Sequence, residues 1–231
     1  LGATIPAYYA LLASRYMHQF GVSEEDLAEF AVLMRRHAAD HPGAQFRDPI
    51  TAADVMASRP IATPLKLLDC CPVSDGGAAF IISHDPTGDR RVRIRGCGQA
   101  HLHQHVSAIK DIAASGTAVA FARAEKCAGV AISDIRYAAI YDSFTITVLM
   151  QLEDLGFCKK GEGGKFVADG NLISGVGKLP FNTDGGGLCS NHPVNRGGMT
   201  KILEAVRQLR GEAHPKVQVK NCDLAIAHGT G

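Results

Sequence analysis

The sequence has little excess charge, no long apolar run and no CxxC pair of cysteines. Its 24 Lys and Arg residues nearly balance its 23 Asp and Glu residues, which leaves a net charge of +1 at pH 7. This balance gives no electrostatic case for binding nucleic acid. No apolar stretch is long enough to span a bilayer, and the N-terminus, LGATIPAYYALL, lacks the basic region that opens a signal peptide. We therefore expect neither a nucleic-acid partner nor a membrane partner.

The cysteines argue against a disulfide framework and against a cysteine zinc site. They are odd in number and scattered along the chain, at Cys70, Cys71, Cys97, Cys127, Cys158, Cys189 and Cys222. Such a pattern indicates reduced thiols and a cytoplasmic protein without a metal site. Most of these thiols should be small buried hydrophobic groups.

The length of 231 residues allows one large or two small domains, and no internal repeat or low-complexity segment is present. The chain begins at Leu1 rather than at Met and stops at Gly231 inside a glycine-rich run. We therefore expect a fragment of a longer protein.

Helices joined by turns are expected in the first eighty residues. Pro6 opens one helix that ends near Phe20, with Gly21 just past its end. Ser23 is expected to cap a second helix whose first turn is acidic, and Thr51 is expected to cap a third, with Asp54 completing a capping box.

Strands alternate with helices in the rest of the chain. Short apolar or alternating runs predict strands at 78–82, 92–95, 137–141 and 224–227, the first and last of them buried. Helical periodicity and caps predict helices at 117–127, 144–155 and 201–209. This alternation predicts an α/β protein built of packed layers.

A histidine between two glycine clusters is the clearest candidate functional residue. His192 lies in GGGLCSNHPVNRGGMT, residues 185–200. Glycines let a backbone approach a ligand closely, and a helix start offers free N–H groups. Imidazole suits proton transfer near neutral pH. The alternative is a histidine in a glycine-rich surface turn.

Other polar groups follow the predicted strands, where sites gather in layered α/β folds. Tyr141 is either structural or part of a site, Asp142 is either a helix cap or part of a site, and His228 is either a buried core histidine or part of a site. The alternating histidines of HLHQH would share one face of a strand as a metal site, but we favour a polar loop for His101, His103 and His105.

Four further motifs stand out along the chain: CCPVSDGGAAFIIS, YDSF with LEDLGFC, LPFNTDGGGLCSNHPVNRGG and AIAHGTG. Taken together, they resemble the thiolase superfamily, and above all the branch with sterol-carrier-protein-type thiolases and bacterial thiolase-like proteins. The resemblance implies a layered α-β-α fold in which most of the N-terminal domain is absent. It implies a helical loop domain at 1–75, the closing strand of the N-terminal domain with a linker at 76–90, and the C-terminal domain at 91–231.

The resemblance also implies roles for individual residues. His192 matches the histidine that activates a nucleophilic cysteine, Tyr141 falls at an oxyanion-hole position, and His228 falls where other thiolases have an acid/base cysteine. Coenzyme A would be bound by the residues at matching glycine-loop and pantetheine positions, Gly229, Gly231 and Cys71. Two departures stand out: Asn191 replaces a glycine, and no cysteine here occupies the nucleophile position. Cys189 is interpreted as structural.

The resulting expectation is a thiolase-like acyltransferase that makes or breaks a C–C bond in acyl-coenzyme A thioesters. The fragment alone should be inactive. One alternative is a retro-aldolase acting on a steroid side-chain CoA ester, and another is a non-catalytic assembly subunit. The resemblance implies a coenzyme A thioester as substrate, no tightly bound cofactor, a homodimer or homotetramer, and a possible small zinc-ribbon and OB-fold partner.

Overall fold

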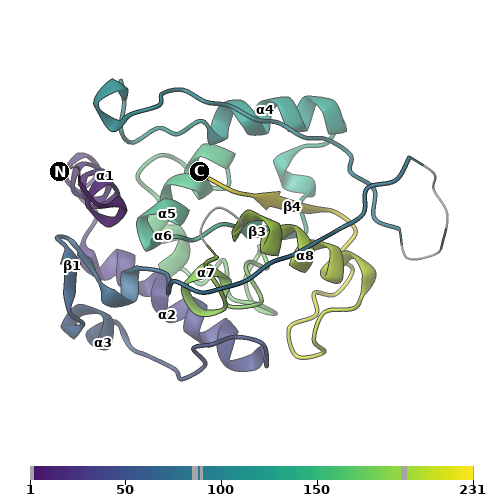
Figure 1. Ribbon diagram of the computed structural model, residues 1–231, viewed down its shortest axis with the longest axis horizontal. Helices are drawn as coiled ribbons and strands as arrows, with labels where there is room; N and C mark the ends of the chain where they lie inside the picture. The colour runs from purple at the N-terminus through teal and green to yellow at the C-terminus, as the bar shows by residue number, and fades with distance from the viewer. Residues whose placement is uncertain (1–2, 85–87, 89–90, 194–196, 231) are drawn as a thin grey trace.

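The computed structural model describes residues 3–84, 88, 91–193 and 197–230 (Figure 1). In chain order its α-helices are α1 (Ile5–Phe20), α2 (Glu24–Asp40), α3 (Ala52–Ala57), α4 (Thr117–Ala128), α5 (Thr145–Leu155), α6 (Gly163–Ala168), α7 (Gly186–Cys189) and α8 (Gly197–Arg210). Its strands are β1 (Pro60–Ala62), β2 (Leu65–Lys66), β3 (Tyr137–Ile140) and β4 (Ala225–His228). Single 3₁₀ turns are η1 (Leu67–Asp69), η2 (Val106–Ala108) and η3 (Ile132–Asp134).

The helix ends predicted from capping residues are confirmed. Helix α1 has a proline in its first turn and ends at Gly21, whose φ of 68° is the left-handed conformation that favours glycine. Ser23 and Thr51 each form a capping box with an aspartate three residues on. These side chains satisfy backbone N–H groups that a helix start leaves free.

The parallel pair β3–β4 forms the centre of a layered arrangement. Its register runs from Tyr137 opposite Ala225 to Ile140 opposite His228. One face, with Tyr137, packs on α8, and the other contributes Ile140 to the main hydrophobic core. That core also takes residues from α1, α2 and α5, so the N-terminal helices and the C-terminal part share it. The α/β layered prediction is confirmed. The prediction that the last strand is buried is wrong, because β4 is half-buried and its Ala227 is exposed.

Two predicted strands do not form. Residues 78–82 and 92–95 have no strand partner, and much of their apolar surface faces solvent: Ile81 is 97% exposed and Ile94 is 69% exposed. In Figure 1 the segment after η1 crosses the molecule as unpaired chain. An apolar run becomes a strand only when neighbouring strands take up its N–H and C=O groups, and the described residues supply no such neighbour here.

The segment around Gly96 and Gly98 lies along α4. A Cβ at Gly98 would come within 1.9 Å of the carbonyl oxygen of Ala120, so only glycine allows this approach. The three histidines of HLHQH are exposed on a loop, as predicted, and no group of His, Cys, Asp and Glu in the described part of the chain is arranged to hold a metal ion. None of the described helices is long and apolar enough to cross a membrane.

Candidate active site

Tyr141 comes directly after β3 and is fixed by bonds to its backbone. Its N–H donates to the carbonyl of His228 at 2.9 Å, and its own carbonyl accepts from the buried amide of Gln151 at 3.1 Å. One residue earlier, the side chain of Asn182 bonds both the N–H and the C=O of Ile140, at 2.9 and 2.7 Å. Three residues therefore fix the backbone at the end of β3, and this fixes the direction in which the Tyr141 side chain extends.

The structure brings Tyr141 and His192 together. The phenol oxygen of Tyr141 is hydrogen-bonded to Nδ1 of His192, and the two rings lie nearly parallel, with centroids 5.4 Å apart. The backbone N–H of His192 donates to the Ser74 hydroxyl at 2.8 Å, which ties this loop to the segment after η1. We call the Tyr141–His192 pair the dyad.

Burial sets the protonation state of the dyad. It lowers the pKa of His192 below its ordinary value and raises the pKa of Tyr141 far above that of a free phenol. At neutral pH the imidazole is therefore neutral and the phenol is protonated. The phenol donates and Nδ1 accepts, which leaves a proton on Nε2.

The two glycine clusters make room for the protein's own side chains. A Cβ at Gly197 would lie 2.1 Å from Cε2 of Tyr141, and one at Gly186 would lie 2.2 Å from a carboxylate oxygen of Asp142. Side chains at either position would displace groups next to the dyad. The groups that approach these two glycines closely are Tyr141 and Asp142, and the predicted approach of the backbone to a ligand stays a prediction.

Asp142 is not a cap of the helix that follows it. The N-cap of α5 is Phe144, without a side-chain cap bond. The fully buried carboxylate of Asp142 instead accepts the N–H groups of Gly187 and Leu188, at 2.6 and 3.2 Å, in the short helix α7. The prediction that Asp142 caps the helix directly after it is therefore wrong. Its carboxylate instead binds free N–H groups of α7, which is distant in sequence.

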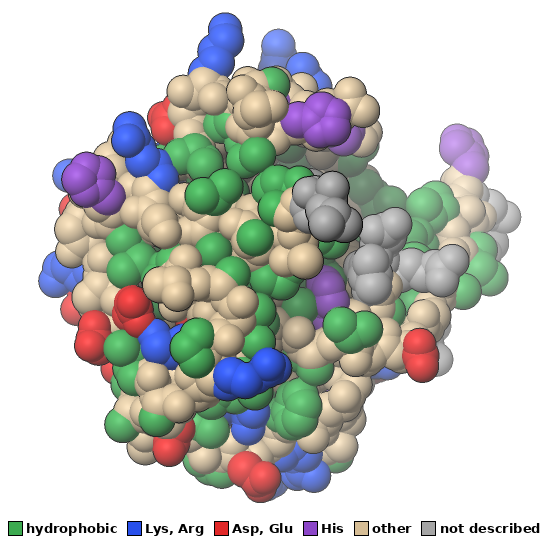
Figure 2. All heavy atoms as spheres, turned by 60° about the vertical axis from the view of Figure 1, so that its left-hand side comes forward, with side chains coloured by type: hydrophobic (Ala, Val, Ile, Leu, Met, Phe, Trp, Pro, Cys, Tyr) green, Lys and Arg blue, Asp and Glu red, His purple; other side chains and the backbone are tan. Residues whose placement is uncertain are grey.

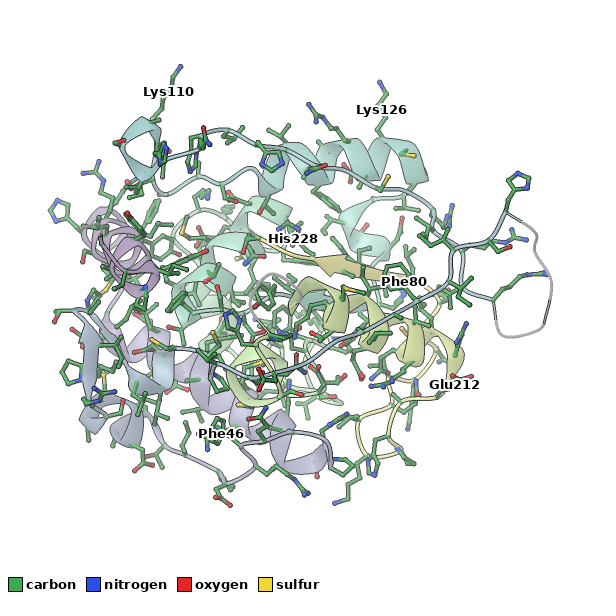
Figure 3. All side chains as sticks on the ribbon, viewed as in Figure 1. Phe46, Phe80, Lys110, Lys126, Glu212 and His228 are labelled. Carbon is green, nitrogen blue, oxygen red and sulfur yellow. The ribbon has the colours of Figure 1, made fainter. Side chains whose placement is uncertain are left out.

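His228 lies beside the dyad but its imidazole is directed elsewhere. Its Nε2 is 2.8 Å from the hydroxyl of Thr117 at the start of α4, and its carbonyl accepts the N–H of Tyr141. Burial lowers the pKa of His228 to about 4, so the ring is neutral at pH 7. Figure 3 labels His228 at the end of β4, where it is half-buried.

Comparison with known proteins identifies the family. The profile described as "Thiolase C-terminal domain-like" matches residues 98–231. An acetyl-CoA acetyltransferase of Methanothermobacter thermautotrophicus is 37% identical over 235 residues, which cover 100% of this chain and 61% of that protein. A steroid side-chain-cleaving aldolase of Thermomonospora curvata is 42% identical over 227 residues, which cover 91% of this chain and 56% of the aldolase.

A solved structure agrees. That of the "Ltp2-ChsH2(DUF35) aldolase" superposes with a TM-score of 0.82 at 35% identity, over 94% of this chain and 58% of the other. The chain belongs to the thiolase superfamily. It spans 56% to 61% of the length of these three proteins.

Two of the three positions that the thiolase resemblance assigns to coenzyme A lie in the described residues, on segments next to α8 and to Ser143. Gly229 lies next to α8, where its Cβ would be 3.6 Å from Gly198, and Gly231 is outside the described residues. The N–H of Cys71 donates to the carbonyl of Ser143 at 3.1 Å. Cys71 also lines a cavity of about 200 Å³ together with Arg35, Phe46, Cys70, Leu188 and Cys189.

Cys71 and Cys189, which line this cavity, are not activated thiols. Burial raises the pKa of both Cys71 and Cys189 to about 12, so each is a protonated thiol at neutral pH. Cys189 is 1% exposed and belongs to the main hydrophobic core, as its structural interpretation predicted.

Sequence reasoning missed three residues at the site. Tyr9 of α1 stacks on Phe144, with ring centroids 4.4 Å apart, and its phenol lies near the side chains of Ser143 and Thr230. Ser74 and Thr117 each bond a predicted site histidine. These contacts join segments far apart in the sequence, so no local pattern could reveal them.

Proposed function

We propose that the intact protein cleaves or forms a carbon–carbon bond next to the thioester of an acyl-coenzyme A, with the Tyr141–His192 dyad carrying the proton. The hydrogen bond from the phenol to Nδ1 of His192, in a chain of the thiolase superfamily, is the observation that supports this most directly. A neutral imidazole that accepts a hydrogen bond from a phenol can act as a base, because a proton can pass to it through the phenol oxygen.

Of the two reactions compatible with this site, retro-aldol cleavage has the better support. It requires proton transfer, which the dyad can carry, and no thiol nucleophile. The 42% identity to an aldolase and the 0.82 TM-score to another point the same way.

The proposed step uses the dyad as a relay. The β-hydroxyl of the substrate gives its proton to the Tyr141 oxygen while the phenol proton passes to Nδ1 of His192. The O–H electrons form a ketone carbonyl, the Cα–Cβ bond breaks, and its electron pair becomes an enolate of the acyl thioester. After the ketone leaves, the imidazolium returns the proton through Tyr141 to the α carbon. Gly229 would donate its N–H to the enolate oxygen, and His228 remains a proposed second proton carrier.

Thiolase-type acyl transfer is the second candidate, because the relative from Methanothermobacter is an acetyl-CoA acetyltransferase. In that reaction His192 would deprotonate a nucleophilic cysteine, which this chain does not supply at a matching position. A cysteine at the nucleophile position of the longer protein would favour this candidate.

The test uses the longer protein of which we propose this chain to be a part, with two substrates. One is a β-hydroxyacyl-CoA with a steroid ring system at its β carbon, and the other is a short β-ketoacyl-CoA with free CoA. We expect ketone release from the first, with turnover reduced by about 100-fold or more in His192→Ala and Tyr141→Phe. Tyr8→Phe, which changes an exposed phenol on α1, is the control. Thiolysis of the second substrate alone would favour acyl transfer, and full turnover in both site variants would refute the proposal.

Assembly and location follow as further proposals. We propose a homodimer or homotetramer in the cytoplasm, with an acyl-CoA as substrate and no tightly bound cofactor. We also propose a small zinc-ribbon and OB-fold partner; the two-component name of the Ltp2-ChsH2(DUF35) aldolase supports a partner protein as such. If the protein co-purifies with such a partner, has no CoA-ester activity and is unaffected by site variants, it is an assembly subunit.

A further inference from the structure

A buried lysine lies behind the dyad. Lys201 of α8 is 1% exposed, whereas lysines are almost never fully buried unless they are paired. Its Nζ is 3.5 Å from Oδ1 of Asp142 and 3.9 Å from Oδ1 of Asp184. Both carboxylates are buried, and Asp142 is fully inaccessible.

The carboxylates around Lys201 are themselves bonded to the protein. Asp142 accepts two N–H groups of α7, and Asp184 accepts the N–H of Gly186 at 3.0 Å. Glu204, one turn further along α8, accepts from Thr183 and from Gln208. Attraction from the ammonium group therefore acts on side chains that are already fixed in place.

This cluster holds both ends of the segment that carries His192. Before the segment, α7 donates backbone hydrogen bonds to Asp142. After it, α8 forms an ion pair with Asp142 through Lys201. Asp142 is also the covalent neighbour of Tyr141. A single carboxylate thus links the two backbones from which the dyad side chains extend.

We infer that the Asp142–Lys201 ion pair positions the dyad for proton transfer. Asp142 and Lys201 are then positioning residues of the proposed site. This inference rests on the proposed function only for its kinetic consequence. Stability alone gives no reason to keep such a pair, because apolar replacements of buried ion pairs are often neutral or stabilising. A fixed geometry does give a reason, because misplacing a catalytic group by about 1 Å can reduce the rate by about 100-fold.

The test compares Lys201→Met with Lys201→Arg in the longer protein. Methionine keeps an unbranched chain without the charge, and arginine keeps the charge. We expect kcat to fall about 10- to 100-fold in Lys201→Met with little change in KM, and to recover in Lys201→Arg. The control is Lys165→Met, which removes an exposed ion pair with Asp169 (76% and 53% exposed side chains).

A second measurement is independent of turnover. In an NMR titration, the His192 imidazole of the Lys201→Met variant should titrate at higher pH than in the parent, because a displaced ring regains solvent. The Lys165→Met variant should titrate like the parent. An unchanged His192 titration together with unchanged kcat in folded Lys201→Met would overturn the inference.

The two proposals fail separately. If His192→Ala keeps full turnover, the proposed function is wrong, and the titration still decides whether Lys201 positions the dyad. If Lys201→Met does not fold, the double variant Asp142→Asn/Lys201→Met, which leaves neither partner charged, takes its place in both measurements. A double variant with parental kcat and His192 titration would overturn the inference as well.

Discussion

At the scale of single residues, the size of Gly197 decides whether Tyr141 can occupy its place. Because an added Cβ would lie 2.1 Å from the Tyr141 ring, we expect Gly197→Ala to reduce the free energy of unfolding by about 1–3 kcal/mol, the usual effect of overpacking. Turnover of the longer protein should fall too. Gly198→Ala is the matched control, since a Cβ there meets nothing within 4 Å. Its stability should stay the same or rise by up to about 1 kcal/mol. Equal urea midpoints for the two variants would contradict this account.

Buried histidines give the second prediction at this scale. His37 of α2 is 4% exposed, and its Nε2 accepts the N–H of Ser174 at 3.0 Å. Burial lowers its pKa to about 4 from an ordinary value near 6.5. Between these two values the unfolded chain binds a proton that the folded chain does not, so stability is lost as the pH falls from about 6.5 to about 4.

For His37 alone this loss amounts to about 3 kcal/mol. The variant His37→Gln keeps an acceptor for Ser174 but does not titrate, so its stability should fall less steeply over this range. His18→Gln, which makes the same exchange at an exposed histidine of α1, is the matched control. Urea denaturation at a series of pH values measures all three proteins. A parental slope in His37→Gln would show that this imidazole is not the group responsible.

At the scale of elements, the sequence predicted what local chemistry determines. The capping boxes of Ser23 and Thr51 form as expected, because each bond joins residues three positions apart. Helix α8 begins at Gly197, four residues before its predicted start. The prediction missed its first turn because two glycines there have low helix propensity, whereas in the structure this turn packs against Tyr141.

The candidate site was predictable only in part, for the same reason. His192 and Tyr141 occupy recognisable motifs, and the structure places them in contact. Lys201 and Thr117 carry no motif, and their partners lie far away in the chain. The direction of the His228 ring depends on which face of β4 it occupies, and that register is fixed by pairing with β3.

At the scale of the whole molecule, charge is dispersed, and two segments without strand partners expose several large apolar side chains. Figure 2 shows acidic and basic side chains interspersed over the face that it displays. The exposed apolar side chains of the predicted strands, by contrast, are concentrated in two unpaired segments: Phe80, Ile81, Ile82 and Ile94 are exposed by 42% to 97%. Unpaired backbone with apolar side chains is a surface that associates with other strands.

We therefore expect these segments to pair with strands of the longer protein, of which this chain would be one part. Hydrogen exchange should show the amides of 78–82 and 92–95 to be slow in the longer protein and fast in residues 1–231 alone. The variant Ile81→Lys should reduce self-association of residues 1–231, measured by light scattering, and destabilise the longer protein by about 1–3 kcal/mol, because a lone charge would be buried between strands. Lys126→Met, an exchange on the exposed face of α4, is the control (Figure 3). Fast exchange of both segments in the longer protein would mean that they remain unpaired there and that the sheet closes without them.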